Sequence, residues 1–393
     1  MTIALIAGRS EARLWGLSGH ERIARQLRSI GGIEVAADLQ SIPGSERVLI
    51  LRADYAYDLR TLTGLLELDG LLMDGCVPAA AHVQAEVAPS ALEIVRADGS
   101  PEPESGIPRI DAGALDAFEA ELRKSEPPLL EPITSETAGA LQDRLYGISY
   151  KGITDFVTKW WWPVPAKAMV RICATAGITP NAVTCTGFAL MLATCWLFYE
   201  GQYFWGLLLG WFMTYLDTVD GKLARVTVQS SQFGHWLDHG MDILHPPFWY
   251  WLWGLSLAGF EPGLGFGFEA LMVFIVVGYG GGRLIEGAFH GLGPVSLFAW
   301  RPFDAWFRLF TARRNPCLVL LTGGWLAGEP GLGFELVAWW TLISSGVMLA
   351  RLAHAGCVRA LRGPLISWLA EDDAAQKHPR SFRTFASTRR AYG

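Results

Sequence analysis

The sequence predicts an α-helical integral membrane domain, with about six transmembrane helices and an interfacial helix, preceded by a small cytosolic α/β domain. Three observations support this fold class. Of the 393 residues, 51% are hydrophobic, and 17 Trp and 20 Phe contribute to a mean hydropathy of +0.26, which is too apolar for an ordinary soluble protein. The later part of the chain holds several apolar segments of about 20 residues, near the length that a bilayer requires. Before them, strand and helix patterns alternate, as in α/β domains.

The first 123 residues form the predicted α/β domain. The apolar runs Thr2–Ala7 and Arg47–Leu51 predict buried strands, and the pattern of Glu21–Ile30 predicts a helix between them. This region carries 19 acidic residues and 11 arginines, a net charge of −8, and the first lysine of the chain is Lys124. The predicted domain is therefore acidic and contains no lysine.

Part of this region is similar to a known nucleotide-binding core. The stretch AGRSEARLWGLSGHERIARQL, followed by LILRADYAYDL, resembles the sugar-type nucleotidyltransferase family. The resemblance implies a glycine-rich phosphate loop after the first strand, a lysine behind it, and a metal-binding aspartate at Asp54. Of the loop glycines only Gly8 remains, and the lysine is missing. We therefore expect a degenerate domain retained for packing, partner binding or regulation, and the alternative is a bifunctional enzyme with an active N-terminal cytidylyltransferase.

The next segment is expected to connect this domain to the membrane. The run SEPPLLEPI at 125–133 is rich in proline and acids, which is typical of a linker. From residue 150, cations alternate with Trp160, Trp161 and Trp162, a pattern typical of a helix in the lipid headgroup layer. The predicted organisation is an α/β domain at 1–123, a linker at 124–150, a membrane domain at 151–362 and a cytosolic tail at 363–393.

Six apolar segments are predicted to span the membrane: 182–200, 203–222, 236–260, 268–288, 308–328 and 335–355. The loops after the first, third and fifth contain glutamates but no Lys or Arg, whereas the opposite loops and the tail are rich in Arg. By the positive-inside rule the basic side and both termini are cytoplasmic, here in a membrane of the bacterial inner type.

The stretch from Asp217 to Asp242 carries the most specific pattern, D-x2-D-G-x2-A-R-x8-G-x3-D-x3-D. The first two aspartates are three residues apart and the last two are four apart, so each pair shares one helix face. Charged groups at a membrane face are costly and indicate function. Carboxylates are the ligands that Mg²⁺ and Mn²⁺ prefer, and the six cysteines show no zinc-ligand spacing. A cation-coupled transporter, the unfavoured alternative, would instead place acids near the bilayer midplane.

At every fixed position the pattern resembles the signature of the CDP-alcohol phosphotransferase family. The resemblance implies an enzyme that transfers a phospho-alcohol from a CDP-alcohol to an acceptor hydroxyl and releases CMP, in phospholipid or phosphodiester biosynthesis. The donor implied is CDP-diacylglycerol or a CDP-polyol such as CDP-inositol, and the acceptor is an alcohol or phospho-alcohol. The implied partners are the lipid bilayer and a second copy in a homodimer, and no nucleic acid.

The resemblance also implies roles for individual residues. Four aspartates would hold two ions, Mg²⁺ or Mn²⁺: Asp217, Asp220, Asp238 and Asp242. Asp238 and Asp242 would be catalytic, with Asp242 as the general base on the acceptor hydroxyl. The run Pro180–Asn–x–x–Thr resembles the family's entry to the first membrane helix. The residues implied for CDP binding are small, polar or cationic, namely Gly221, Ala224, Arg225, Gly234, Asn181 and Thr184.

Cations elsewhere in the chain are candidates for binding an anionic acceptor or the alcohol group of the donor. These candidates are Arg283, Lys151, Arg171, Arg313 and Arg314. Ordinary positive-inside charge is the alternative explanation for each of them, and the sequence leaves it open.

Overall fold

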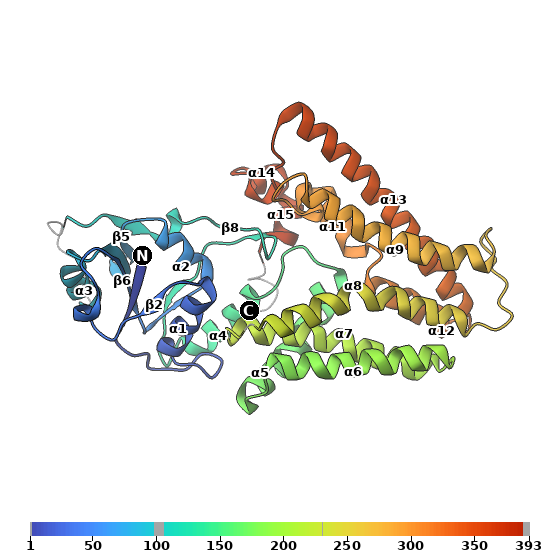
Figure 1. The fold of residues 1–393 in the computed structure, drawn as a ribbon, viewed down its shortest axis with the longest axis horizontal. Helices are drawn as coiled ribbons and strands as arrows, with labels where there is room; N and C mark the ends of the chain where they lie inside the picture. The colour runs from blue at the N-terminus through green and yellow to red at the C-terminus, as the bar shows by residue number, and fades with distance from the viewer. Residues whose placement is uncertain (1, 98–105, 230, 388–393) are drawn as a thin grey trace.

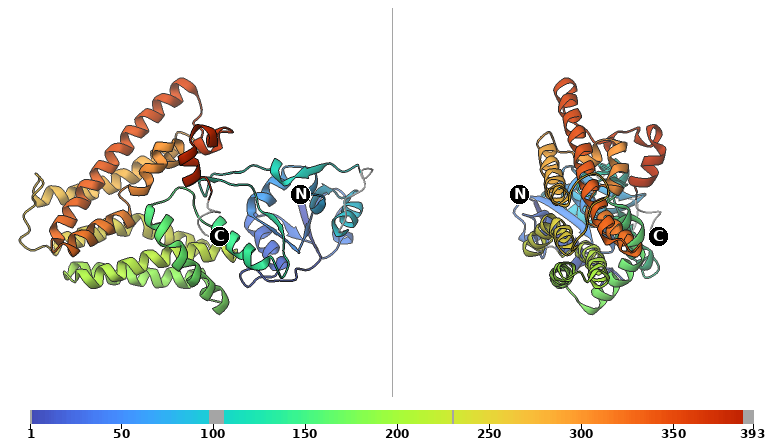
Figure 2. Two further views of the ribbon diagram at one scale, coloured as in Figure 1. Left: turned by 180° about the vertical axis from the view of Figure 1, so that it is seen from behind. Right: turned by 90° about the vertical axis from the view of Figure 1, so that its right-hand side faces the viewer.

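The structure is a computed structural model and describes residues 2–97, 106–229 and 231–387. The side chains of Phe233, His235, Asp238 and His239 lie outside the described set. The chain has an α/β part and a helical part, which lie end to end along the long axis of the molecule (Figure 1). Figure 2 shows the same division from behind. This arrangement agrees with the predicted combination of an α/β region and a membrane-type helical region.

The α/β part is built on a six-stranded mixed sheet with the order β2-β1-β3-β6-β5-β7. The strands are β1 (Thr2–Ala7), β2 (Glu34–Val35), β3 (Arg47–Arg52), β5 (Gly70–Asp74), β6 (Val77–Gln84) and β7 (Arg109–Asp111). Strand β1 pairs in parallel with β2 and β3, whereas β6 is antiparallel to both β3 and β5. Separate apolar cores form on the two faces of the sheet. The helices are α1 (Gly19–Ile30), α2 (Leu59–Leu66) and α3 (Ala88–Arg96).

Local sequence explains where α1 begins. Ser18 accepts a hydrogen bond from the backbone N–H of Glu21, and the Glu21 carboxylate accepts one from the N–H of Ser18. This reciprocal capping satisfies two backbone donors at the helix start. In this helix the side chains of Arg22 and Arg25 donate to the carbonyls of Val226 and Thr227 in the helical part of the chain.

The segment expected to be a linker is ordered and joins the two parts. Within it, β10 (Leu130–Pro132) pairs antiparallel with β4 (Tyr55–Tyr57) of the α/β part, and α4 (Ala138–Ile148) follows. Leu129 and Leu145 are buried in one apolar core together with residues of the helix that carries Asp217 and Asp220. The short strands β8 (Phe118–Glu119) and β9 (Lys124–Ser125) pair with each other. The apolar residues among the prolines anchor this segment, so the boundary predicted at 123 falls inside a packed region.

The helical part places a helix at or near each of the six predicted spans. These helices are α6 (Pro180–Tyr199), α7 (Tyr203–Val226), α8 (Gln232–Leu255), α9 (Phe268–His290), α12 (Arg314–Leu326) and α13 (Pro330–Arg362). Among the described residues, three helices are long and apolar enough to cross a membrane, namely α6, α9 and α13. Membrane helices are therefore present, and the count of six spans stays a prediction.

The fifth predicted span differs from expectation. Residues 308–328 are divided between α11 (Pro302–Phe310) and α12, with a break at Thr311–Arg313. Helix α12 has 13 residues, or about 20 Å, which is shorter than the hydrocarbon core of a bilayer. The break places Arg313 and Arg314 at the start of α12, where both make ion pairs. The two arginines therefore lie at the break and not inside a continuous span.

Large apolar side chains point outward along these helices. Trp196, Trp205, Val277 and Leu349 are each more than half exposed. An exposed apolar surface of this extent marks a lipid-facing region. Before α6, a π-helical turn (Val157–Trp161) leads into α5 (Pro163–Ala176) at the position of the expected interfacial helix. After α13, residues of the predicted tail form α14 (Ala374–Lys377) and α15 (Pro379–Phe385).

Candidate active site

Two of the motif aspartates meet at one cation. Arg314 Nη2 donates to Asp217 Oδ2 at 2.5 Å, and Arg314 Nη1 donates to Asp217 Oδ1 at 3.2 Å and to Asp242 Oδ1 at 2.9 Å. Asp217 lies on α7, Asp242 on α8 and Arg314 at the start of α12. Side chains from three helices therefore converge here, and the positive charge of Arg314 lies between two carboxylates.

A third motif aspartate is held by α6. Thr184 Oγ1 lies 2.6 Å from Asp220 Oδ2 and 3.1 Å from the carbonyl of Pro180. Thr179 caps α6 and Pro180 occupies its first turn, a position where the missing N–H of proline costs nothing. The Pro–Asn–x–x–Thr run thus positions a hydroxyl against the carboxylate of Asp220. Both side chains are buried.

A proline fixes the position of Asp242. Pro246 lies inside α8 and has no N–H, so it cannot donate to the carbonyl of Asp242 four residues earlier. Two side chains of α9 donate to that carbonyl instead: Tyr279 Oη at 2.9 Å and Arg283 Nη2 at 2.8 Å. These two hydrogen bonds satisfy the carbonyl of Asp242, which has no donor within α8. They also attach the backbone at Asp242 to α9.

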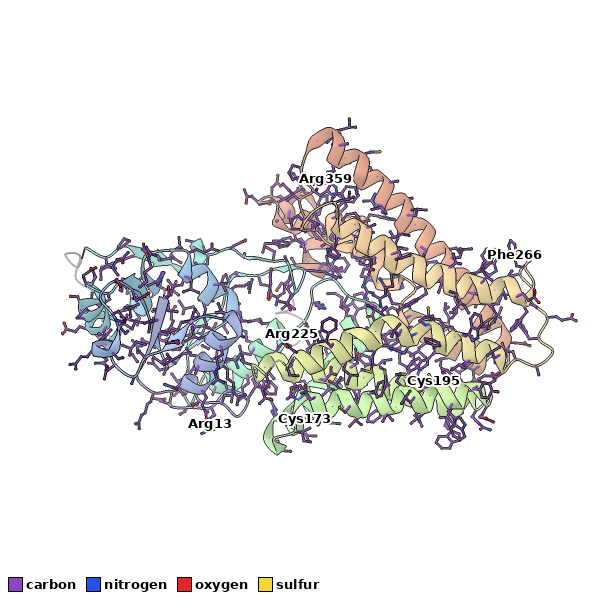
Figure 3. All side chains as sticks on the ribbon, viewed as in Figure 1. Arg13, Cys173, Cys195, Arg225, Phe266 and Arg359 are labelled. Atoms are coloured by element: carbon purple, nitrogen blue, oxygen red, sulfur yellow. The ribbon has the colours of Figure 1, made fainter. Side chains whose placement is uncertain are left out.

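A pocket of about 400 Å³ lies beside these carboxylates. All six residues predicted to bind CDP line it: Asn181, Thr184, Gly221, Ala224, Arg225 and Gly234. Asp220 lines it as well. Figure 3 shows Arg225 where the α/β part meets the helical part. The pocket is lined by residues of both parts and is therefore located at their junction.

Gly234 lets two helix ends approach each other at this pocket. A Cβ atom at this position would lie 2.5 Å from Asn181 Oδ1 and 3.0 Å from Ser231 Oγ. Ser231 Oγ donates to Asn181 Oδ1 at 2.8 Å and accepts from the Gly234 N–H at 2.9 Å. The glycine of the motif is thus required for the close contact between α6 and α8.

The other wall of the pocket comes from the α/β part, which sequence reasoning missed. Arg22, Gln26, Asp58 and Arg60 line the pocket together with the motif residues. Arg22 Nη1 also donates to the carbonyl of Val226 at 2.7 Å, in the last turn of α7. Burial lowers the pKa of Arg22 to about 10 and the charge of Asp58 opposes this change, so the guanidinium stays charged at neutral pH. No local pattern marks these residues, because they line the pocket only once the two parts have docked.

The acceptor candidates separate into two groups. Lys151 is exposed and interacts electrostatically with Arg225 and Asp242. Arg283 Nη1 lies 3.6 Å from Glu286, and Arg313 pairs with the same glutamate beside Asp242. Arg171 instead pairs with Asp143 of α4 at 3.4 Å, and it does not line the described pocket. Arg283 and Arg314 therefore contact Asp242 directly, Arg313 and Lys151 add positive charge on the same side, and Arg171 is separate.

The carboxylate oxygens of the described aspartates are suitable ligands for a divalent cation. Asp217 and Asp242 already bind one cationic group from two different helices, and Asp220 follows one turn after Asp217 on α7. Among the described side chains, no group of three or more His, Cys, Asp or Glu has the close geometry of a metal site. The side chain of Asp238, the fourth predicted ligand, lies outside the described residues. An all-oxygen donor set of this kind suits Mg²⁺ or Mn²⁺.

The part of the chain that is similar to known proteins contains the aspartates of this site. Residues 177–279 match the family model described as CDP-alcohol phosphatidyltransferase. The archaetidylinositol phosphate synthase of Pyrococcus horikoshii is 36% identical over 96 residues, which are 24% of this chain and 50% of the relative. The phosphatidylinositol phosphate synthase of Streptomyces avermitilis is 36% identical over 67 residues, 17% of this chain and 28% of the relative. Cholinephosphotransferase 1 of Xenopus laevis is 30% identical over 125 residues, 28% of this chain and 29% of the relative. The chain spans half or less of the length of these relatives.

Proposed function

We propose that the chain transfers a phospho-alcohol from a CDP-alcohol to an acceptor hydroxyl, with release of CMP, since residues 177–279 match the CDP-alcohol phosphatidyltransferase family model. One observation carries the proposal. Asp217 and Asp242, from two different helices, bind the same cationic side chain next to the pocket that the six predicted CDP-binding residues line. The roles of the individual residues below are part of the proposal.

Attack on a diphosphate is opposed by its negative charge. Mg²⁺ or Mn²⁺, two ions held by Asp217, Asp220, Asp238 and Asp242, would neutralise that charge and align the reacting oxygens. Arg225 lines the pocket and would bind phosphate oxygens of the donor. Asp242, whose side chain is 43% exposed, would accept the proton of the acceptor hydroxyl as general base.

The cations around Asp242 favour an acceptor that carries phosphate. Lys151, Arg283 and Arg313 give this side of the site positive charge, which would bind a phosphorylated polyol. Two of the relatives are named as synthases of inositol phosphate lipids. We therefore propose inositol phosphate or a similar polyol phosphate as acceptor and CDP-diacylglycerol or a related CDP-lipid as donor. The reaction would take place at the cytoplasmic face of an inner-type membrane, in a homodimer.

An acceptor panel tests the substrate assignment. Purified protein with Mg²⁺ and CDP-diacylglycerol or CDP-inositol would be given inositol phosphate, free inositol or glycerol phosphate, and products identified by mass spectrometry. We expect a lipid product from CDP-diacylglycerol with inositol phosphate, and at least about 10-fold less with free inositol, because a charge-assisted contact is lost. Equal use of free inositol would refute the phosphorylated acceptor.

The bifunctional alternative has less support. Both carboxylate oxygens of Asp54 accept hydrogen bonds from Arg52, at 2.9 and 2.6 Å. Gly8 keeps the left-handed conformation expected of a turn glycine, with φ of +77°, but no lysine follows it before Lys124. A pyrophosphate-release assay with CTP and a phospho-alcohol decides this alternative.

A further inference from the structure

The wall of the pocket formed by α1 contains two polar side chains that the proposed reaction does not yet use. Arg22 and Gln26 are four residues apart, so they lie on the same face of the helix. They are 5% and 2% exposed, and both line the pocket with Thr184, Asp220 and Arg225. Figure 1 shows α1 at the end of the α/β part that faces the helical part.

Each of these side chains is fixed by one hydrogen bond and has another polar atom left over. Arg22 Nη1 donates to the carbonyl of Val226, and Gln26 Nε2 donates to the carbonyl of Tyr57 at 2.8 Å. Within the described part of the chain, Arg22 Nε and Gln26 Oε1 are buried and have no hydrogen-bond partner. Buried polar atoms are normally satisfied, and an exception in a pocket wall indicates that something else binds there. The two atoms offer one donor and one acceptor.

We propose that Arg22 and Gln26 bind the nucleoside of the CDP-alcohol donor, so that the α/β part forms one wall of the donor site. This inference rests on the proposed function. An amide oxygen would repel phosphate, so the diphosphate belongs at the opposite wall with Arg225 and the divalent cations that the carboxylates would hold. Cytosine presents an amino donor beside ring and carbonyl acceptors, and this combination pairs with one acceptor and one donor. Ribose hydroxyls have the same capacity.

This assignment gives the α/β part a role that does not need its missing lysine and glycines. The donor would bind only where the two parts meet, because the helical part supplies the phosphate wall and α1 supplies the nucleoside wall. Arg22 links the two roles, since the same guanidinium binds the last turn of α7. Carbonyls at a helix C-terminus lack intrahelical partners and attract cations, which holds α1 in place there.

Arg25 provides a matched control. Its Nη1 donates to the carbonyl of Thr227 at 2.9 Å, at the same end of α7. Arg25 lines a different, smaller pocket with Trp15 and Thr227, and does not line the one that contains Asp220. Arg25→Met therefore removes an equivalent contact between the two parts without changing the proposed donor site.

The test is CDP binding to the full-length protein in nanodiscs with Mg²⁺, measured by isothermal titration calorimetry. Gln26→Met removes the amide oxygen, and Arg22→Lys keeps a cation near Val226 but removes Nε–H. We expect each change to raise the Kd for CDP about 10-fold or more, and Arg25→Met to leave it within about twofold. A fall in the CDP/UDP preference of either variant assigns the contact to the base, and a fall in the CDP/2′-deoxy-CDP preference assigns it to the ribose; both support the proposal.

Two results would count against it and are distinguishable. If the wild-type protein binds CDP and both variants bind it equally well, the nucleoside wall is wrong and the proposed function stands. If the wild-type protein does not bind CDP at all, the proposed function fails and this inference fails with it. Thermal unfolding of each variant checks its fold, and Arg22→Lys tests the proposal alone if Gln26→Met does not fold.

Discussion

Asp242→Asn is expected to lower kcat by about 10²- to 10⁴-fold, the usual contribution of a general base. The asparagine keeps the shape of the side chain and still accepts a hydrogen bond from Arg314, so the fold should be retained. It cannot take a proton from the acceptor hydroxyl, and it is a weaker ligand for a divalent ion. Initial rates of CMP release at saturating donor measure the effect, with circular dichroism as the check on folding.

Asp54→Asn is the matched control for this change. It alters a carboxylate of the α/β part that is bonded to Arg52 and does not line the described pocket. Its CMP release should stay within about twofold of wild type. If Asp242→Asn keeps the kcat of the wild type, Asp242 is not the general base. Loss of activity in Asp54→Asn would instead indicate catalysis by the α/β part.

Arg314→Met is expected to destabilise the metal-free protein by about 3 kcal/mol. Loss of one partner of a buried ion pair costs about 3–5 kcal/mol, and the lower end applies because the Asp242 side chain is 43% exposed. The variant leaves the carboxylates of Asp217 and Asp242 close together and removes the positive charge of Arg314 from between them. Added Mg²⁺ should restore much of this loss, since a divalent cation would bind between the same carboxylates. Thermal unfolding in EDTA and then in excess Mg²⁺ measures both effects.

A second ion pair in the helical part serves as control. Arg351 Nε donates to Asp304 Oδ1 at 2.6 Å, and Asp304 is fully buried. Arg351→Met should also destabilise the protein, but Mg²⁺ should not restore its stability. An equal response of the two variants to Mg²⁺ would mean that Arg314 does not mark a cation site.

The features that the sequence predicted correctly are those that depend on residues close together in the chain. The strand Thr2–Ala7 was predicted with its observed bounds, and most of α1 was predicted as well, because apolar periodicity and capping act within one element. The motif from Asp217 to Asp242 identified the family, since its spacing is fixed by two helix faces. The match of residues 177–279 to the CDP-alcohol phosphatidyltransferase family model confirms this resemblance, whereas the bounds 151–362 of the membrane domain stay a prediction.

Contacts between distant segments could not be predicted in this way. Arg314 was proposed for an anionic substrate, and the structure pairs it with Asp217, 97 residues earlier in the chain. The docking of Arg22 on Val226 joins residues 204 apart. Pro246 indicates a missing hydrogen bond inside helix α8, but nothing in the sequence shows that Tyr279 would satisfy the carbonyl of Asp242 that it leaves free. Tertiary packing determines these contacts, and the repeat of apolar residues within one helix or strand carries no information about them.

The proposed function requires that the aspartates of α7 and α8 split a cytidine diphosphate ester with the help of divalent cations. Metal-dependent release of CMP from CDP-diacylglycerol by the purified chain, compared with Asp217→Asn, tests this directly. We expect CMP release with Mg²⁺ or Mn²⁺, none in EDTA, and none from the variant under either condition. CMP release that persists in EDTA or in Asp217→Asn would contradict the proposed function.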